Sequence, residues 1–291
     1  MSTVEAREPA LAARRADGRR GNAVAAVYGA ELLKLRAQMR VWLITGVVLV
    51  APWLFIVLLK GQDRLPTDAL YGRYLKSAGL ATPLLLLGFL ASWGFPLLTA
   101  FVSGDIFASE DQQGTIKTIA TRSVSRSALF WGKVAASFTW SIGIVVVMAA
   151  SSIAAGPVVI GTQPLTSVSG TTIPLGHAFA LVIASWAICL APFLGFACIS
   201  LLVSVLSKSS VVGVLIPLVI GFVMQLYAFL NGKDLIRHNL LTTPFLAWHG
   251  ILHVPAFYAP MWYGFAVSAV YSIVSLALAY WVFNRRDITG G

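Results

Sequence analysis

The sequence predicts an all-α integral membrane protein, because it carries little charge and contains long apolar segments without ionised residues. Of its 291 residues, 58% are hydrophobic and only 11% are charged, and the mean hydropathy is +0.82. A soluble domain has about 25% charged residues, so this chain lacks the polar surface that keeps a globule in solution. A helix of about 20 apolar residues crosses the hydrocarbon core, and several segments reach that length.

Six segments free of Asp, Glu, Lys and Arg are predicted to cross the membrane as one domain over residues 41–291. The uncharged run 134–207 contains two of them, because a loop rich in Gly, Pro, Ser and Thr at 156–177 divides it. The spans are expected at about residues 41–59, 79–103, 134–155, 178–206, 210–231 and 261–283.

The uncharged run 239–284 is too long for one span, since it would reach about 69 Å as a helix. Pro255 and Pro260 interrupt it, and helices tend to end before a proline. We interpret residues 240–259 as a re-entrant segment that packs against the bundle, because non-helical backbone at that depth must be buried in protein. The alternative is an extracellular loop on the surface.

Basic residues predict the orientation. Most of the 21 Lys and Arg residues lie before span one, between spans two and three, or after span six. The positive-inside rule therefore makes both termini cytoplasmic. Topology and anionic lipid explain the net charge of +10, so nucleic-acid binding is not expected. Residues 1–22 are interpreted as a disordered basic tail, because no apolar region with a cleavage site follows them.

Residues 23–40 have the spacing of an amphipathic helix that lies along the inner membrane surface. The alternative is that they extend span one into the cytoplasm. The apolar positions are Val24, Val27, Tyr28, Leu32, Leu35 and Met39.

The chain shows no motif for ATP binding or catalysis. It has no GxxxxGK[ST] loop, no HExxH, no GxSxG and no paired carboxylates, so no catalytic site is predicted. All eleven acidic residues lie outside the predicted spans, which disfavours proton-coupled transport. Cys189 and Cys198 share one apolar run and are interpreted as buried free thiols.

His249 and His253 would share a face on a helix and are half of a possible metal site, with His238 as the nearest candidate to help. The alternative is that they bind backbone groups in a re-entrant turn or meet a partner subunit. We favour the second interpretation and predict no metal.

A polar segment at 103–137 joins spans two and three. Ser109 is expected to cap a short helix with acidic residues in its first turn, and Gly114 is expected to end it. Ser125 is expected to open a second helix that merges into span three. Such a cytoplasmic coupling helix can receive force from a soluble motor, although similar loops often only connect spans.

This segment and both ends of the chain resemble the permease subunits of ATP-binding cassette (ABC) transporters of the second type. Members have a glutamate, Gly-Thr, Ser-Arg and a lysine in this loop, a Glu-x-x-Lys amphipathic helix and an aromatic-x-Arg-Arg-Asp ending. The matching residues are Glu31, Lys34, Glu110, Gly114, Thr115, Ser125, Arg126, Lys133, Phe283, Arg285, Arg286 and Asp287. The resemblance covers nearly all of the chain after residue 23, but the loop 156–177 departs from the best-known drug and sterol pumps.

The resemblance implies several partners. Two permease copies, expected here as a homodimer, form one pathway, and two copies of a separate ABC ATP-binding subunit dock beneath them. ATP and Mg²⁺ are bound by that partner, and this chain binds no cofactor. The family also has re-entrant helices before span six. Carried over by position, the ATPase-coupling residues are Glu110, Asp111, Gly114, Thr115, Lys117, Arg126 and Lys133.

The substrate path is expected along spans two and five of both copies, by analogy with the family. Such aromatic residues also serve helix packing or lipid contact, which is the alternative. An uncharged, aromatic interior favours a hydrophobic or amphipathic cargo. The candidate residues are Phe89, Trp93, Phe101, Phe222, Met224 and Gln225.

We therefore expect the membrane-spanning permease subunit of an ATP-driven ABC exporter in the plasma (inner) membrane of a prokaryote. Its cargo would be an antibiotic, drug, peptide or lipid. One alternative is an intramembrane metal-dependent or lipid-modifying enzyme that uses His249 and His253. The other is a sensory or immunity subunit that binds a ligand without moving it.

Overall fold

The computed structural model describes residues 23–62, 71–74, 77–115, 124–230 and 233–286, and most of these are helical. A helix over residues 23–37 comes first. The labelled helices are α2 (Met39–Lys60), α3 (Ala81–Ser103), α4 (Ala108–Gln112), α6 (Arg126–Val159), α7 (Leu175–Leu206), α8 (Ser210–Phe229), α9 (Asp234–Asn239) and α10 (Ala259–Arg285). Two 3₁₀ helices, η1 (Gly72–Tyr74) and η2 (Thr243–Leu252), and two short strands, β1 (Leu165–Thr166) and β2 (Thr172–Ile173), complete the fold.

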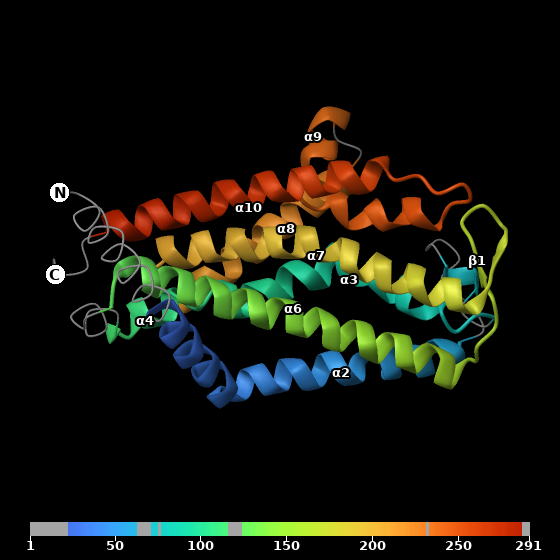
Figure 1. Ribbon diagram of the computed structural model, residues 1–291, viewed down its shortest axis with the longest axis horizontal. Helices are drawn as coiled ribbons and strands as arrows, with labels where there is room; N and C mark the ends of the chain where they lie inside the picture. The colour runs from blue at the N-terminus through green and yellow to red at the C-terminus, as the bar shows by residue number, and fades with distance from the viewer. Residues whose placement is uncertain (1–22, 63–70, 75–76, 116–123, 231–232, 287–291) are drawn as a thin grey trace, which may run out of the picture.

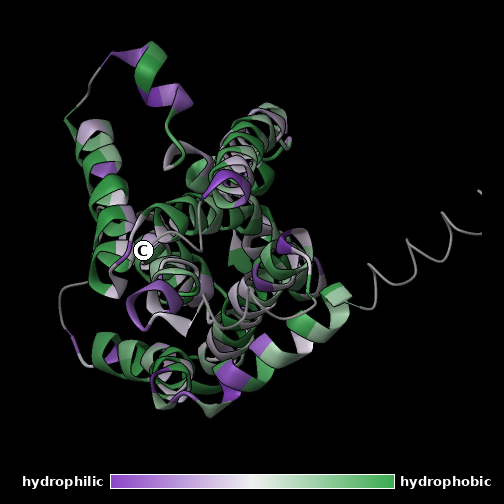
Figure 2. Ribbon diagram, turned by 90° about the vertical axis from the view of Figure 1, so that its left-hand side faces the viewer, coloured by the Kyte–Doolittle hydropathy of each residue, from purple (hydrophilic) through white to green (hydrophobic). Residues whose placement is uncertain are grey.

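The long helices α2, α6, α7 and α10 run along the longest axis of the molecule (Figure 1). The helix over residues 23–37, α4 and the last turn of α10 lie at one end, which we call the α4 end. The antiparallel pair of β1 and β2 lies at the other, the hairpin end. Viewed from the α4 end, the long helices are mainly hydrophobic (Figure 2).

Five helices are long and apolar enough to cross a membrane: α2, α6, α7, α8 and α10. Helix α3 is bent near residues 90–93, and its two halves together meet the same requirement, which would make six. A helix therefore lies at each of the six segments predicted from the sequence. The all-α membrane class is confirmed, with a short β-hairpin as the exception.

Helix α6 is longer than the predicted span three at both ends. Ser125 caps it as expected, since its Oγ accepts a hydrogen bond from the Ala128 amide at 3.2 Å. At the other end the helix continues through Gly156, which we had placed in the loop. Gly156 packs directly on Gly79. A Cβ atom on Gly156 would lie 2.2 Å from the Gly79 carbonyl oxygen, so this contact requires glycine inside the helix.

The rest of the predicted loop 156–177 contains the hairpin of β1 and β2. Leu165 of β1 and Ile173 of β2 are buried. The Val168 amide donates to the Leu252 carbonyl at 3.1 Å, and the Val254 amide donates to Ser169 Oγ at 3.0 Å. The hairpin thus covers the end of the bundle and is bound to η2 and the segment that follows it.

Helix α7 lies at the centre and packs against α3, α6, α8, α10 and η2. Aromatic rings from three elements meet beside it: Phe95 lies 5.1 Å from Phe193 and 5.4 Å from Phe245, between ring centroids. Phe245 and Trp248 of η2 are fully buried, so this part of segment 240–259 is inside the bundle and not on its surface. Cys189 and Cys198 are buried free thiols, as predicted.

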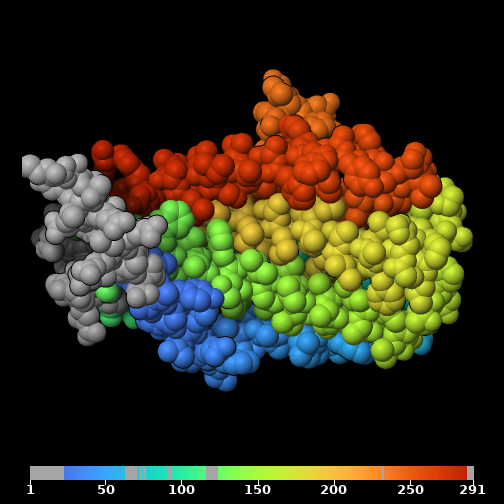
Figure 3. Space-filling model, viewed as in Figure 1, coloured from blue at the N-terminus to red at the C-terminus, as the bar shows by residue number. Residues whose placement is uncertain are grey.

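The outer faces of α2, α8 and α10 expose large apolar side chains, as expected where lipid replaces water. The outward residues of α10, for example, include Val270, Ile273 and Trp281. The short helix α9, with Asp234 and Arg237, projects from the long side of the molecule (Figure 3).

Helices α3 and α8 meet so closely at the α4 end that only glycine fits. A Cβ atom on Gly213 would lie 2.1 Å from the Gly104 carbonyl oxygen. We predict that Gly213→Ala lowers the free energy of unfolding by about 1–3 kcal/mol, because overpacking must separate the two backbones. Thermal unfolding in detergent measures the loss.

Gly46→Ala is the matched control, because a Cβ atom on Gly46 meets nothing within 4 Å in helix α2. Alanine is the better helix former, so this variant should be as stable as the wild type or slightly more stable. Equal stability of the Gly213→Ala and Gly46→Ala variants would contradict the close contact.

Candidate functional site

The short helix α4 follows α3 in the chain and begins at Ala108, two residues earlier than a cap at Ser109 predicts. Ser109 is inside the helix and does not cap it, since its Oγ donates to the Asp105 carbonyl at 2.7 Å. The cap comes from another helix: Ser204 Oγ of α7 accepts from the amides of Phe107 and Ala108 at 3.0 and 3.1 Å. Sequence reasoning missed this contact because it joins residues far apart in the chain.

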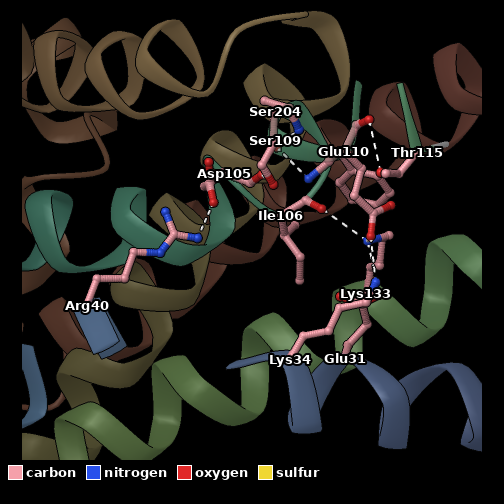
Figure 4. A network of polar contacts seen from close by, with 12 residues as sticks. Glu31, Lys34, Arg40, Asp105, Ile106, Ser109, Glu110, Thr115, Lys133 and Ser204 are labelled. Atoms are coloured by element: carbon pink, nitrogen blue, oxygen red, sulfur yellow. Dashed lines mark hydrogen bonds and ion pairs between the residues drawn. The ribbon is translucent and has the colours of Figure 1, made fainter. Parts of the chain in front are cut away.

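Glu110 is the central acid of the site. Its Oε1 atom lies 2.7 Å from Lys34 Nζ and 2.8 Å from Lys133 Nζ (Figure 4). The residue is 9% exposed. The carboxylate therefore faces the helix over residues 23–37 and α6, and it does not face outward from α4.

Lys133 of α6 is the most buried charged residue of the site, with a side chain that is 0% exposed. Its ammonium group has three acceptors, namely Glu110, Glu31 Oε1 at 3.1 Å and the Ile106 carbonyl at 3.1 Å. It also lies 5.5 Å from the centroid of the Phe107 ring. A lysine ammonium has three donors, so each can be used, which is what a buried charge requires.

Lys34 completes the set by donating to Glu31 Oε1 at 2.8 Å. We call Glu31, Lys34, Glu110 and Lys133 the Glu110 network. It joins three elements with two acids and two bases. Nearly half of the Lys34 side chain is exposed, so its ion pairs contribute little stability. The buried contacts of Lys133 contribute most.

The network shifts the ionisation of its members. Burial alone would raise the pKa of Glu110, but the adjacent ammonium groups of Lys133 and Lys34 outweigh it and lower that pKa. Burial opposes the charged form of Lys34 as well, yet hydrogen bonds and charges from Glu110 and Glu31 raise its pKa. Glu110 and Lys34 are therefore both ionised at neutral pH.

A second acid, Asp105, joins α2 and α8 to the same region. It is 1% exposed and accepts from the Arg40 guanidinium and the Ser210 hydroxyl. The Ser210 amide also donates a hydrogen bond to Gln112 Oε1 at 2.9 Å. The sequence analysis did not select Asp105, although an acid directly after an apolar run is a signal that could have found it.

A cleft of about 900 Å³ opens between the helix over residues 23–37, α4 and the start of α8. Its wall includes three residues of the Glu110 network together with Asp105 and apolar side chains. The residues are Glu31, Lys34, Glu110, Asp105, Leu35, Val102 and Ile106. The helix over residues 23–37 thus has its apolar face on protein: Val27, Tyr28, Leu32 and Leu35 pack against a buried cluster. A break at Gln38 separates it from α2, so it does not simply extend that helix.

The structure places most of the predicted coupling residues around α4. Asp111 is held by the Arg286 guanidinium. Gly114 ends the turn with a positive φ of 69°, as expected, and Thr115 is exposed beside it. Arg126 begins α6, and Lys117 lies outside the described residues.

Three of the predicted substrate-path residues lie on an exposed face of α3 and α8. The rings of Trp93 and Phe222 are 5.4 Å apart and line an apolar groove of about 250 Å³. Phe89 is exposed, and its ring centroid lies 6.3 Å from the ring centroid of Phe55. The other three, Phe101, Met224 and Gln225, are partly buried.

No group of three or more possible metal ligands occurs around the histidines or elsewhere in the described part of the chain. The His249 ring packs edge-on against Trp248, 4.1 Å between centroids. His238 Nδ1 lies 2.7 Å from the Asp234 carbonyl, in α9.

A family model described as ABC-2 family transporter protein matches residues 29–224. The match covers well over half of the chain and includes all four residues of the Glu110 network. The chain therefore belongs to the ABC-2 transporter family and is a multi-pass membrane permease. No curated protein matches the sequence.

We predict that Lys133→Met lowers the free energy of unfolding by about 3–5 kcal/mol, because two buried carboxylates lose their buried partner and keep only the half-exposed Lys34. Lys60→Met is the control: Lys60 is exposed and makes one hydrogen bond, to the Val159 carbonyl. Adding Glu31→Gln and Glu110→Gln to Lys133→Met should recover part of the loss. Unfolding in detergent followed by intrinsic fluorescence measures all variants, and a Lys133→Met protein as stable as Lys60→Met would contradict the network's role.

Proposed function

We propose that this ABC-2 permease is the membrane subunit of an ATP-driven exporter, with its α4 end in the cytoplasm of a prokaryote. Membership of the family implies association with a separate ABC ATP-binding subunit. Two copies of each would form the transporter, with ATP and Mg²⁺ on the partner. The bundle then has six spans, with bent α3 as the second and η2 as the re-entrant segment before the sixth.

The segment 105–111 makes polar contacts with every long helix except α3, which precedes this segment directly. This set of contacts is the single observation that supports ATP coupling. Lys133 links it to α6, Arg40 to α2, Ser204 to α7, Ser210 to α8 and Arg286 to α10. A displacement of α4 by a bound motor would therefore act on the whole bundle. A loop that merely connects two spans does not need such contacts.

Glu110 acts inside the permease in this proposal. Its Oε1 atom is bound by Lys34 and Lys133. Glu110 therefore positions α4, and the exposed residues beyond it contact the ATPase. Gln112, Gln113, Gly114 and Thr115 are the exposed residues at the end of α4. Asp111, Arg126 and Lys133 position this surface from within.

The substrate path would run along the exposed face of α3 and α8, with a second copy opposite. The groove between Trp93 and Phe222 is lined by apolar side chains together with Pro96 and Gly221. None of the side chains that line the groove is charged, so the groove has no group that would pair with an ion. A hydrophobic or amphipathic molecule fits this lining best.

We predict that Gln113→Arg lowers capture of the ATP-binding subunit by about tenfold, because one misplaced charge at an interface costs on the order of 1.4 kcal/mol. Co-purification of the tagged permease with the ABC ATPase from the same organism measures it. Gln163→Arg, at the exposed hairpin end, is the matched control and should bind as the wild type does.

Equal losses for both variants, or no capture by the wild type, would contradict the proposal. ATP-dependent uptake of a fluorescent lipid analogue into inside-out vesicles then separates an exporter from a subunit that only binds its ligand.

A further inference from the structure

Residues 284–286, which we call the C-terminal anchor, lie at the end of α10 and contact both α4 and the start of α6. In α4, Asp111 accepts from the Arg286 guanidinium. At the first residue of α6, Arg126 Nη1 donates to the carbonyls of Asn284 and Arg286, at 3.1 and 2.9 Å. The anchor therefore binds α4 and α6 to the end of α10.

Arg286 also joins the anchor to the central helix. Its Nη1 atom donates to the Val205 carbonyl at 3.0 Å, one residue before the end of α7. The Arg286 and Asp111 side chains are 23% and 12% exposed. A charge-assisted hydrogen bond with this little solvent is worth more than a surface ion pair.

Neighbouring carboxylates of α4 are thus held by different elements. Glu110 is held by the helix over residues 23–37 and by α6, whereas Asp111 is held by the anchor on α10. Removing one set of contacts leaves the other in place. The helix α4 would then stay attached to the bundle but could tilt away from α10 and α7.

We propose that Arg286 is a positioning residue that transmits the displacement of α4 to α10 and α7, so that the C-terminal anchor is part of the coupling machinery. This inference rests on the proposed function, because it assumes an ATPase bound at α4. It assigns a role to the end of the chain, which lies outside the residues 29–224 matched by the family model.

The test compares Arg286→Met with Arg285→Met in the assembled transporter. The two arginines are adjacent and carry the same charge, but the Arg285 guanidinium lies over the Trp281 ring, 4.6 Å from its centroid, which is a contact within α10. ATP hydrolysis by the complex is measured relative to the ATPase subunit alone, together with co-purification and the KM for ATP.

We expect Arg286→Met to lower the permease-dependent stimulation of hydrolysis by about tenfold, the scale of one lost charge-assisted hydrogen bond. Co-purification and the KM for ATP should stay at wild-type values. Arg285→Met should behave as the wild type, and Arg286→Asp combined with Asp111→Arg should restore stimulation. Wild-type stimulation in Arg286→Met, or an equal loss in Arg285→Met, would overturn the proposal.

A second measurement does not depend on the ATPase. Amide hydrogen exchange of residues 108–112 should be faster in Arg286→Met than in Arg285→Met, because α4 loses one attachment. If the wild-type permease fails to bind or stimulate the ATPase, the proposed function is wrong and this exchange experiment decides the anchor alone. Equal exchange in the two variants would overturn the anchor.

Discussion

The buried ammonium group of Lys133 is the interaction on which the α4 end of this permease depends. A charge without solvent must have a full set of acceptors, and here Glu31, Glu110 and the Ile106 carbonyl provide them. These acceptors come from the first helix, α4 and the linker before it. One lysine therefore fixes how three separate segments are placed on α6.

This constraint explains why the amphipathic helix is not a free membrane anchor. Its apolar face packs on the bundle, and its two charged network residues pair with α4 and α6. The apolar interior of the bundle stabilises the fold but does not determine which way its helices move. The polar contacts around α4 provide connections between that helix and the spans, as a transporter driven by a separate ATPase would need.

Much of the fold could be predicted from the sequence, because membrane helices are long, apolar and free of charge. The positions of the six segments and the helix opened by Ser125 follow from that pattern. The prediction that the loop begins at Gly156 is wrong, because α6 continues to Val159 and the sequence does not show that Gly156 packs on Gly79. Glu31, Lys34, Glu110 and Lys133 were all recognised as family motif residues, but their meeting in one network depends on tertiary contacts. Asp105 and Ser204 were missed for the same reason.

Because Lys133 of α6 binds groups of the first helix and of α4, these three segments should move as one unit in the proposed ATP-driven transporter. Spin labels on Leu33→Cys and Trp131→Cys, both exposed positions outside the proposed ATPase contact, would report the distance between the first helix and α6 in the assembled transporter. The account predicts the same distance distribution without nucleotide and with trapped ATP. A shift of that distribution on ATP binding would contradict it.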